Sequence, residues 1–309
     1  MHPLYFDKLI IENQYVDIPL VNGIRLYIKR EDKNHLFVSG NKLRKLKYNI
    51  LQAKKENKTT LLTFGGAYSN HIAATASAGK LMGFNTIGII RGNELASKID
   101  ENPTLSFAQQ CGMEFSFVTR EAYRHKDNEF FLNHIKTNYG SDIYIIPEGG
   151  TNELAVKGCE EILTEQDSEF DFICTAVGTG GTIAGLINSS FSHQIVLGFP
   201  ALKGEFLSDV IKNYTKKTNW QLIHDYNFGG YAKISDELIS FLNNFNKKTG
   251  ISLDPIYTGK MIFAIFALSN KNYFKPNSKI LAIHTGGLQG IQGINQKRHK
   301  EHKEILNYG

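Results

Sequence analysis

Cysteine is scarce in this chain, with three residues among 309. Cys111, Cys159 and Cys174 are too few and too scattered for a disulfide framework or a four-cysteine zinc site, which favours a reducing compartment. The densest apolar run, residues 261–268, is too short to cross a bilayer, and residues 1–8 contain no apolar signal core. We therefore expect a cytoplasmic protein with no membrane partner.

The chain also lacks a large net charge of either sign. The 35 Lys and Arg residues against 30 Asp and Glu give a net charge of +5, which suits small anionic ligands better than a nucleic-acid surface. His299 and His302 form the one pair with metal-ligand spacing, but they lie in the basic tail 296–303, which we interpret as a solvated helix end. We expect neither a metal site nor a nucleic-acid partner.

What the chain does have is an alternation of apolar strand-like and helical segments, which is typical of an α/β protein with mostly parallel strands. The hydrophobic content of 41% is enough for a packed core. Strands are predicted at 25–29, 60–64, 86–91, 114–118, 142–147, 171–177, 194–199, 220–224 and 279–284. Helices are predicted at 42–57, 70–82, 104–111, 152–166, 182–190, 207–217, 235–249 and 259–270.

Glycine-containing turns follow three of the predicted strands, at 65–70, 178–182 and 285–288. Turns that follow parallel strands lie at the carboxyl edge of the sheet, where α/β proteins form their ligand crevices. The sequence therefore predicts a ligand site where these turns meet.

The segment 177–185 predicts an anion site. Glycines let several backbone N–H groups turn toward one point, and the positive end of the following helix adds to them. No Lys-Ser/Thr pair of a Walker loop follows the glycines, and Ile183 stands where a dinucleotide fingerprint needs glycine or alanine. A tight turn without a ligand is the alternative. The candidate phosphate ligands are Gly178, Thr179, Gly180, Gly181 and Thr182.

Lys42 is the candidate nucleophile. Ser39, Gly40 and Asn41 resemble a helix entry, which places Lys42 in the first helical turn. The helix dipole disfavours a cation there, and Arg44 and Lys45 crowd it further, so the neutral amine is favoured. A solvated basic helix face is the alternative.

A second helix start at Ser69, Asn70 and His71 offers a hydroxyl, a carboxamide and backbone N–H groups. Such a group can bind a carboxylate or a phenolic oxygen, or can simply cap the helix. Tyr231 and Tyr257 lie in glycine-marked turns, although most tyrosines serve packing.

In order and spacing, these motifs resemble the 1-aminocyclopropane-1-carboxylate deaminase / D-cysteine desulfhydrase family of pyridoxal-phosphate enzymes. The resemblance rests on residues 39–45, 65–71, 177–185, 230–231, 254–260 and 284–287. It implies a two-lobed tryptophan synthase β-like fold (pyridoxal-phosphate fold type II), with open, mostly parallel sheets flanked by helices and the cofactor in the interlobe cleft. A large cofactor-binding domain is expected at 1–44 plus 148–309, a small α/β domain at 45–147, and a homodimer as the assembly.

The resemblance also implies roles for single residues. Lys42 is expected to bond covalently to pyridoxal 5′-phosphate, with Lys45 assisting the 178–182 loop at the phosphate. Asn70 is expected to face the phenolic oxygen, and Ser69 with the N–H groups of Asn70 and His71 to receive the substrate carboxylate. The remaining roles are substrate contact and proton transfer by Tyr231 and Tyr257, and a hydroxyl near the pyridine nitrogen from Thr258 or Thr285.

Two departures from the deaminase pattern bear on the reaction. The deaminases of this family look to carry a glutamate at the position of Thr258 and a glutamine at the position of His71. Both favour β-elimination from a small amino acid to pyruvate and ammonia, with D-cysteine releasing hydrogen sulfide. However, the desulfhydrases of this family look to carry an arginine at the position of Ala73.

Three alternatives remain for the function. The first is 1-aminocyclopropane-1-carboxylate deaminase, which forms 2-oxobutanoate and ammonia. The second is another pyridoxal-phosphate reaction, such as serine or threonine dehydration or racemisation. The third is a non-catalytic protein that binds a phosphorylated metabolite through the 178–182 loop.

Overall fold

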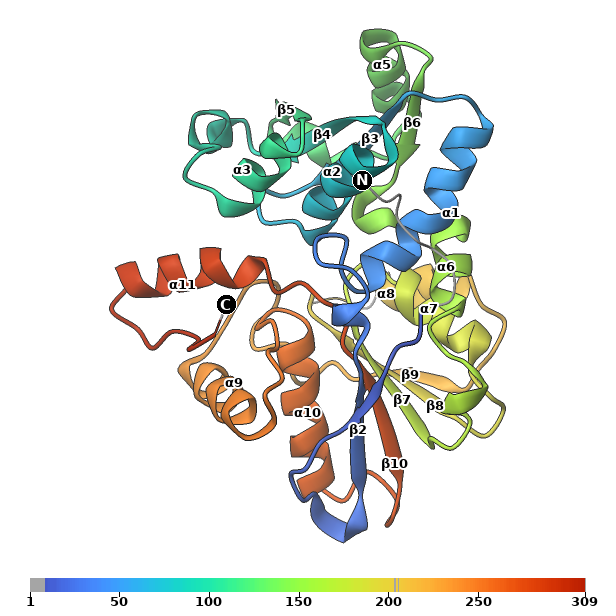
Figure 1. The fold of residues 1–309 in the computed structure, drawn as a ribbon, viewed down its shortest axis with the longest axis vertical. Coiled ribbons are helices and arrows are strands. Elements are labelled where there is room, and N and C mark those ends of the chain that lie inside the picture. Colours follow the sequence, from blue (N-terminus) through green and yellow to red (C-terminus); the bar gives the residue numbers. More distant parts are fainter. Residues whose placement is uncertain (1–8, 203, 205, 309) are drawn as a thin grey trace.

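The computed structural model describes residues 9–202, 204 and 206–308 and has two lobes, each built on its own open sheet (Figure 1). The larger sheet has the strand order β1-β2-β10-β7-β8-β9 and the smaller one β5-β4-β3-β6. All neighbouring strands are parallel except β1 and β2. The expectation that no signal core is present concerns residues 1–8, which lie outside the described residues.

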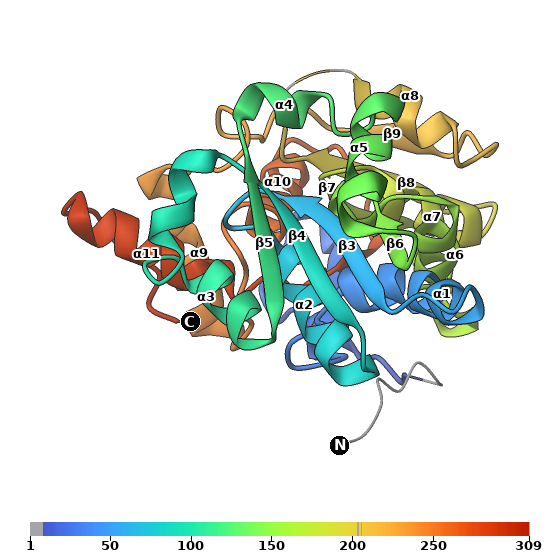
Figure 2. The same cartoon turned by 90° about the horizontal axis from the view of Figure 1, so that it is seen from above.

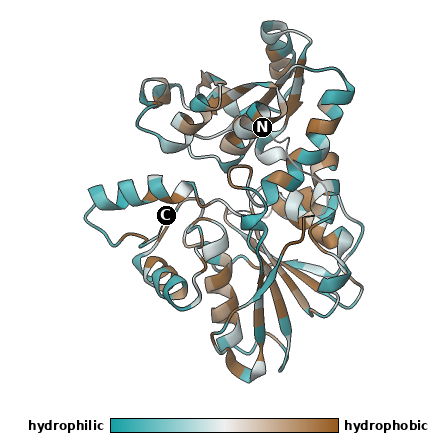
Figure 3. Cartoon of the chain, viewed as in Figure 1, coloured by the Kyte–Doolittle hydropathy of each residue, from teal (hydrophilic) through white to brown (hydrophobic). Residues whose placement is uncertain are grey.

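The larger sheet is covered on both faces. Its strands are β1 (Asn13–Tyr15), β2 (Arg25–Lys29), β7 (Phe172–Val177), β8 (Ile195–Pro200), β9 (Trp220–Leu222) and β10 (Lys279–Ile283). Its helices are α6 (Glu153–Glu160), α7 (Gly181–Ser189) and α8 (Phe206–Lys212) on one face, with α9 (Asp236–Thr249) and α10 (Thr258–Asn270) on the other. Alternate residues of β7 pack into the two apolar clusters, which explains its unbroken apolar run (Figure 3).

The smaller sheet is also a helix-covered layer (Figure 2). Its strands are β3 (Thr60–Gly65), β4 (Asn85–Arg91), β5 (Met113–Val118) and β6 (Ile143–Ile146). Helices α2 (Asn70–Met82) and α3 (Pro103–Gln110) pack on one face, and α4 (Arg120–Arg124) and α5 (Glu129–Tyr139) on the other.

Helix α1 (Asn41–Lys55) runs between the two lobes and contacts α2 of the smaller one as well as α6 and α7 of the larger one (Figure 1). The expected domain boundary after residue 44 falls in the first turn of this helix, so the division into 1–44 plus 148–309 and 45–147 stays a prediction. The C-terminal helix α11 (Gly290–Lys300) reaches across to α3.

The nine predicted strands are all present within a few residues, but two predicted helices are too long. The helix expected at 152–166 ends at Glu160, because Thr164 and Asp167 form a capping box that begins a separate 3-10 turn. The helix expected at 207–217 ends at Lys212. Strand β1 and helices α4 and α5 were not predicted, and of α11 only the helix end within 296–303 was expected.

Neither a membrane span nor a metal cluster emerges from the residues that the structure describes. Within those ranges, no helix combines the length and the apolar character needed to cross a bilayer. The same residues contain no group of three or more His, Cys, Asp or Glu side chains able to hold a metal ion.

Candidate active site

The three glycine turns and the start of α1 come together at the facing edges of the two sheets. The Asn41 side chain donates to Thr182 Oγ1 at 2.8 Å, and its backbone N–H donates to the Thr285 carbonyl at 3.3 Å. From the smaller lobe, Asn70 Oδ1 accepts from Gln289 Nε2 at 3.0 Å. These contacts join segments that are more than 100 residues apart in the sequence.

Gly40 fixes the entry of α1 into this site. Its φ is +67°, and a Cβ there would lie 2.0 Å from the Thr285 carbonyl oxygen. A side chain is therefore excluded by both conformation and space. The close approach sets the first turn of α1, which carries Lys42, against the turn that follows β10.

Lys42 is partly exposed, and its Nζ lies 3.4 Å from the Gly149 carbonyl oxygen. Removal from water, followed by the charge of Lys45, lowers the pKa of Lys42 to about 7. No carboxylate pairs with it among the described residues. The expectation that Arg44 also crowds Lys42 is wrong, since Arg44 turns away to Glu31, with Nη2 to Oε1 at 2.8 Å.

Lys45 lies one turn further along α1 and is buried. Its Nζ donates to the Gly149 carbonyl at 2.9 Å, to Thr151 Oγ1 at 3.0 Å and to Thr179 Oγ1 at 3.4 Å. Burial lowers the pKa of Lys45 to about 8. The side chain thus connects α1 to the glycine turn after β7.

That glycine turn leaves the N-terminus of α7 without a side-chain cap. Gly180, the N-cap residue, is left-handed with φ +86°. A Cβ on Gly181 would lie 3.2 Å from Lys45 Nζ, so the glycine keeps the space between the helix end and the ammonium open. Uncapped N–H groups beside a cation suit a phosphate, and the low-pKa amine of Lys42 suits an aldehyde. These residues therefore fit pyridoxal phosphate.

The start of α2 differs, because its first N–H groups already have a partner. Ser69 Oγ accepts from the His71 N–H at 3.2 Å and from the Ile72 N–H at 3.4 Å. The structure thus supports the alternative that Ser69 caps this helix. A substrate carboxylate at this helix start would share these amides with Ser69.

The His71 imidazole is buried and neutral. Burial, with the charges of Lys42 and Lys45, holds its pKa well below the usual range. Thr63 Oγ1 donates to the Ile146 carbonyl at 2.9 Å, so at 2.8 Å it accepts the proton of His71 Nε2. His71 Nδ1 is then a buried acceptor that has no hydrogen-bond partner among the described residues.

Tyr231 and Tyr257 form an edge-on pair with ring centroids 6.2 Å apart. Burial raises the pKa of both phenols, most strongly that of Tyr257. Tyr257 also lies against Gly178, where a Cβ would be 3.3 Å from its Cε1. The two tyrosines therefore border the glycine turn from the side of α10.

Thr258 and Thr285 differ in what their hydroxyls do. Thr258 Oγ1 donates to Asp254 Oδ2 at 2.5 Å and accepts from the Asp254 N–H at 3.1 Å, so it is engaged within its own turn. The Thr285 hydroxyl makes no hydrogen bond with the part of the chain that the structure describes.

Two basic residues at the site were not singled out from the sequence. Lys260 is buried one turn after Tyr257, and its Nζ donates to the carbonyls of Asn227 at 2.8 Å and Gly230 at 2.9 Å, just before Tyr231. Arg91 ends β4 beside the glycine turn of β3. The carboxyl-edge rule that located the turns also covers Arg91, whereas the partners of Lys260 are about 30 residues away in the sequence.

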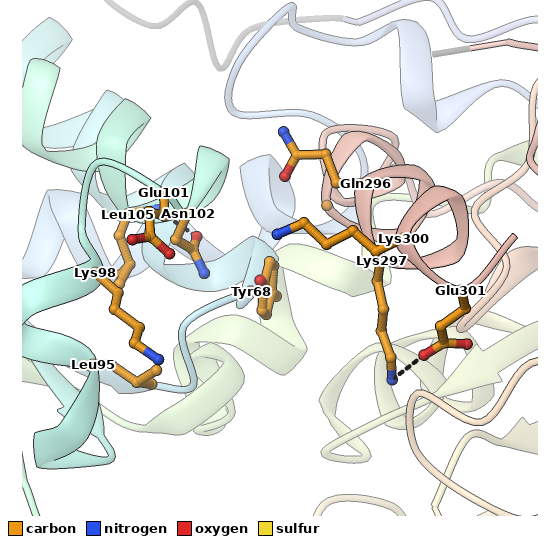
Figure 4. Close-up of a pocket in the computed structure, with 11 residues that line it drawn as sticks. Tyr68, Leu95, Lys98, Glu101, Asn102, Leu105, Gln296, Lys297, Lys300 and Glu301 are labelled. Atoms are coloured by element: carbon orange, nitrogen blue, oxygen red, sulfur yellow. Dashed lines mark hydrogen bonds and ion pairs between the residues drawn. The ribbon is translucent and has the colours of Figure 1, made fainter.

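A separate cavity of about 730 Å³ lies between α11 and the α3 region of the smaller lobe (Figure 4). It contains Tyr68 from the glycine turn, with Lys98 and Lys300 around it, but not Lys42. The cavity is therefore distinct from the predicted site around Lys42.

The two open sheets face each other across helix α1, which carries Lys42. This is the arrangement of a two-lobed α/β enzyme with its candidate site between the lobes. The chain belongs to the pyridoxal-phosphate dependent enzyme family, whose profile matches residues 9–286. Its fold is therefore fold type II of these enzymes, and its cofactor is pyridoxal phosphate.

Known relatives carry both names suggested by the motifs. The chain is 31% identical to a putative 1-aminocyclopropane-1-carboxylate deaminase of Pyrococcus horikoshii, over 87% of this chain and 86% of that protein. It is 32% identical to the mitochondrial bifunctional D-cysteine desulfhydrase/1-aminocyclopropane-1-carboxylate deaminase of Arabidopsis thaliana, over 88% of this chain and 74% of that protein. The crystal structure of an ACC deaminase homologue superposes with a TM-score of 0.80 at 28% identity, covering 95% and 94% of the two chains.

Proposed function

We propose that this enzyme is a lyase that removes the β-substituent of a small amino acid and releases pyruvate and ammonia, with D-cysteine as the leading substrate and hydrogen sulfide as the further product. The observation that carries the proposal is Lys42, an amine with its pKa lowered to about 7, in a site that also holds an uncapped helix end and the Tyr231–Tyr257 pair. We further propose a homodimer located in the cytoplasm.

The phosphate of the cofactor is held by residues 178–182 and Lys45. Asn70 lies where it can face the phenolic oxygen, while the α2 start at Ser69, Asn70 and His71 receives the substrate carboxylate. Thr285, whose hydroxyl is not engaged elsewhere in the described chain, is our candidate for the pyridine nitrogen in preference to Thr258.

Bound pyridoxal phosphate supplies the electron sink that spreads the negative charge left on the α-carbon when its proton departs. Because its pKa is lowered to about 7, Lys42 released from the cofactor is able to accept that proton at neutral pH. Tyr231 and Tyr257 stay protonated because burial raises their pKa, so they can donate to the departing group. The chain thus offers a base and two proton donors.

A second candidate is 1-aminocyclopropane-1-carboxylate deaminase, which the name of the Pyrococcus relative favours. The engaged hydroxyl of Thr258 argues against it, because the deaminase pattern needs a carboxylate at that position. Dehydration of serine or threonine and racemisation remain further outcomes of the same test, and family membership argues against a non-catalytic phosphometabolite-binding protein.

The test is an assay of 2-oxo acid release from D-cysteine, L-cysteine, D-serine and 1-aminocyclopropane-1-carboxylate. We expect D-cysteine to give the highest kcat/KM, and Lys42→Ala to abolish turnover together with the visible absorbance of the lysine-bound cofactor. Lys54→Ala, at an exposed position of the same helix, is the matched control. Turnover of the cyclopropane substrate alone would replace the proposal with the second candidate.

A further inference from the structure

Arg91 is a basic side chain at the site for which the proposed chemistry has no use. It is the last residue of β4, next to β3, where Ile90 pairs with Gly65. One guanidinium nitrogen lies 3.6 Å from the place where a Cβ on Gly66 would stand. The guanidinium therefore lies over the start of the turn that leads to Ser69.

No carboxylate pairs with this guanidinium within the described ranges. The carboxylate of Glu148, which contacts the same tyrosine as Arg91, accepts from the Tyr123 hydroxyl at 2.9 Å and pairs with Lys126 Nζ at 3.3 Å. Arg91 is left with the face of the Tyr123 ring, its Cζ 5.8 Å from the centroid. Other arginines, such as Arg44, Arg120 and Arg298, have ion pairs.

The charge of Arg91 acts across the gap between the lobes. Burial raises the pKa of Tyr231, whereas the hydrogen bond with Tyr257 and the charge of Arg91 lower it. Arg91 from the smaller lobe and Tyr231 from the larger one are thus close enough for the charge to act on the phenol. Because the guanidinium lies over Gly66, three residues before Ser69, a substrate whose carboxylate lies at the α2 start would be able to extend its side chain toward Arg91.

We propose that Arg91 determines specificity by binding an anionic group on the substrate side chain, so that the preferred amino acids carry a second negative charge beside the α-carboxylate. The proposal rests on the proposed function, whose substrate class it names. A guanidinium binds a carboxylate, sulfonate or thiolate by charge-assisted hydrogen bonds. Stabilising a thiolate also fits cysteine, whose departing group is a sulfur anion.

The experiment compares D-aspartate with D-asparagine, which have nearly the same shape and differ in side-chain charge. Their affinities for the cofactor-loaded enzyme are measured by calorimetry for the wild type, Arg91→Gln and Arg91→Lys. Arg120→Gln is the matched control, because Arg120 is also an exposed arginine and begins α4 two residues after the neighbouring strand β5. We expect the wild type and the control to bind aspartate about tenfold more tightly, since charged hydrogen bonds contribute that much.

In Arg91→Gln the preference should vanish while the affinity for asparagine stays within about twofold, and Arg91→Lys should keep part of it. Equal losses for both amino acids would show that Arg91 binds the α-carboxylate and would overturn the proposal. A wild type without the preference, a preference that survives in Arg91→Gln, or no binding of either amino acid would overturn it too. Neither ligand has a β-leaving group, so absent elimination activity would count against the proposed function alone.

Discussion

The turns at the starts of α2 and α7 have the same design and opposite outcomes. Each joins a buried parallel strand to a helix through glycine residues, at the carboxyl edge of its sheet. At α2 the N-cap is Ser69, whose hydroxyl accepts from two of the first N–H groups. At α7 the N-cap is Gly180, which has no side chain to offer, so those amides face the site.

The difference teaches that the N-cap residue decides whether a helix start is closed or is available to a ligand. A serine cap satisfies the amides internally and stabilises the helix, whereas glycine leaves them for an outside anion. The lobe with the glycine cap is therefore the one that holds the phosphate in our proposal. Four changes can break or sharpen this contrast.

The largest effect is expected from adding a methyl group to each turn. Gly181→Ala places a Cβ 3.2 Å from Lys45 Nζ and 3.0 Å from Thr151 Oγ1, which closes the anion space. We expect cofactor affinity to fall about 100-fold, or about 3 kcal/mol, in a fluorescence titration. Gly66→Ala in the other turn meets its nearest atom at 3.6 Å and should change the affinity less than threefold. Equal losses of cofactor affinity in the two variants would contradict the proposed difference between the two turns.

Lys42→Met should stabilise the cofactor-free protein, because removing the Lys42 amine from water without a carboxylate partner costs free energy. Its pKa is about 7 when folded and 10.5 when unfolded, so wild-type stability rises with pH across that window. The variant should therefore gain about 2 kcal/mol at pH 6, allowing for partial exposure, and progressively less toward pH 10. Urea unfolding at both pH values measures this, and a gain independent of pH would contradict the assignment.

Lys260→Met tests whether the Lys260 ammonium holds the loop that carries Tyr231 in place. The carbonyls of Asn227 and Gly230 lose their shared donor, and the loop that carries Tyr231 is released. We expect kcat to fall about tenfold with little change in KM, corresponding to about 1.4 kcal/mol. In a Tyr231→Phe background the same change should add almost nothing, and Lys248→Met on the exposed face of α9 is the neutral control.

The smallest effect concerns the cap itself. Ser69→Ala leaves the first amides of α2 without their acceptor and should lower the free energy of unfolding by about 1 kcal/mol, while Ser69→Gly should cost only a few tenths. Thermal unfolding of both variants measures this difference. A loss of equal size in both would mean that the hydroxyl does not cap the helix in solution.

The layers of the fold were predictable because unbroken apolar strands are a local signal. The run of β7 is buried on both faces, and the turns at strand ends meet as the parallel topology requires. Strand β1 was missed because Asn13–Tyr15 is a short, polar edge strand that depends on its pairing with β2. The first part of helix α11 was missed because a polar surface helix has little periodic signal, although Ile291 is fully buried.

The candidate site was predictable as an ordered set of motifs but not in its electrostatics. The sequence indicated that Lys42 has a low pKa, yet the main cause is desolvation, which only the packed structure shows. It also placed Arg44 beside Lys42, whereas the guanidinium turns to Glu31, a choice set by tertiary contacts. The partners of Lys260 lie far away in the sequence, so no local pattern marks it, whereas Arg91 at the end of β4 falls under the carboxyl-edge rule.

The position of α1 has a mechanical consequence. This helix packs on α2 as well as on α6 and α7, and its contacts with α6 are the most extensive. If one lobe swings against the other, an amine at the start of this helix would therefore stay with the larger lobe, which also carries the 178–182 loop. Its distance to that loop would then change less than its distance to the start of α2.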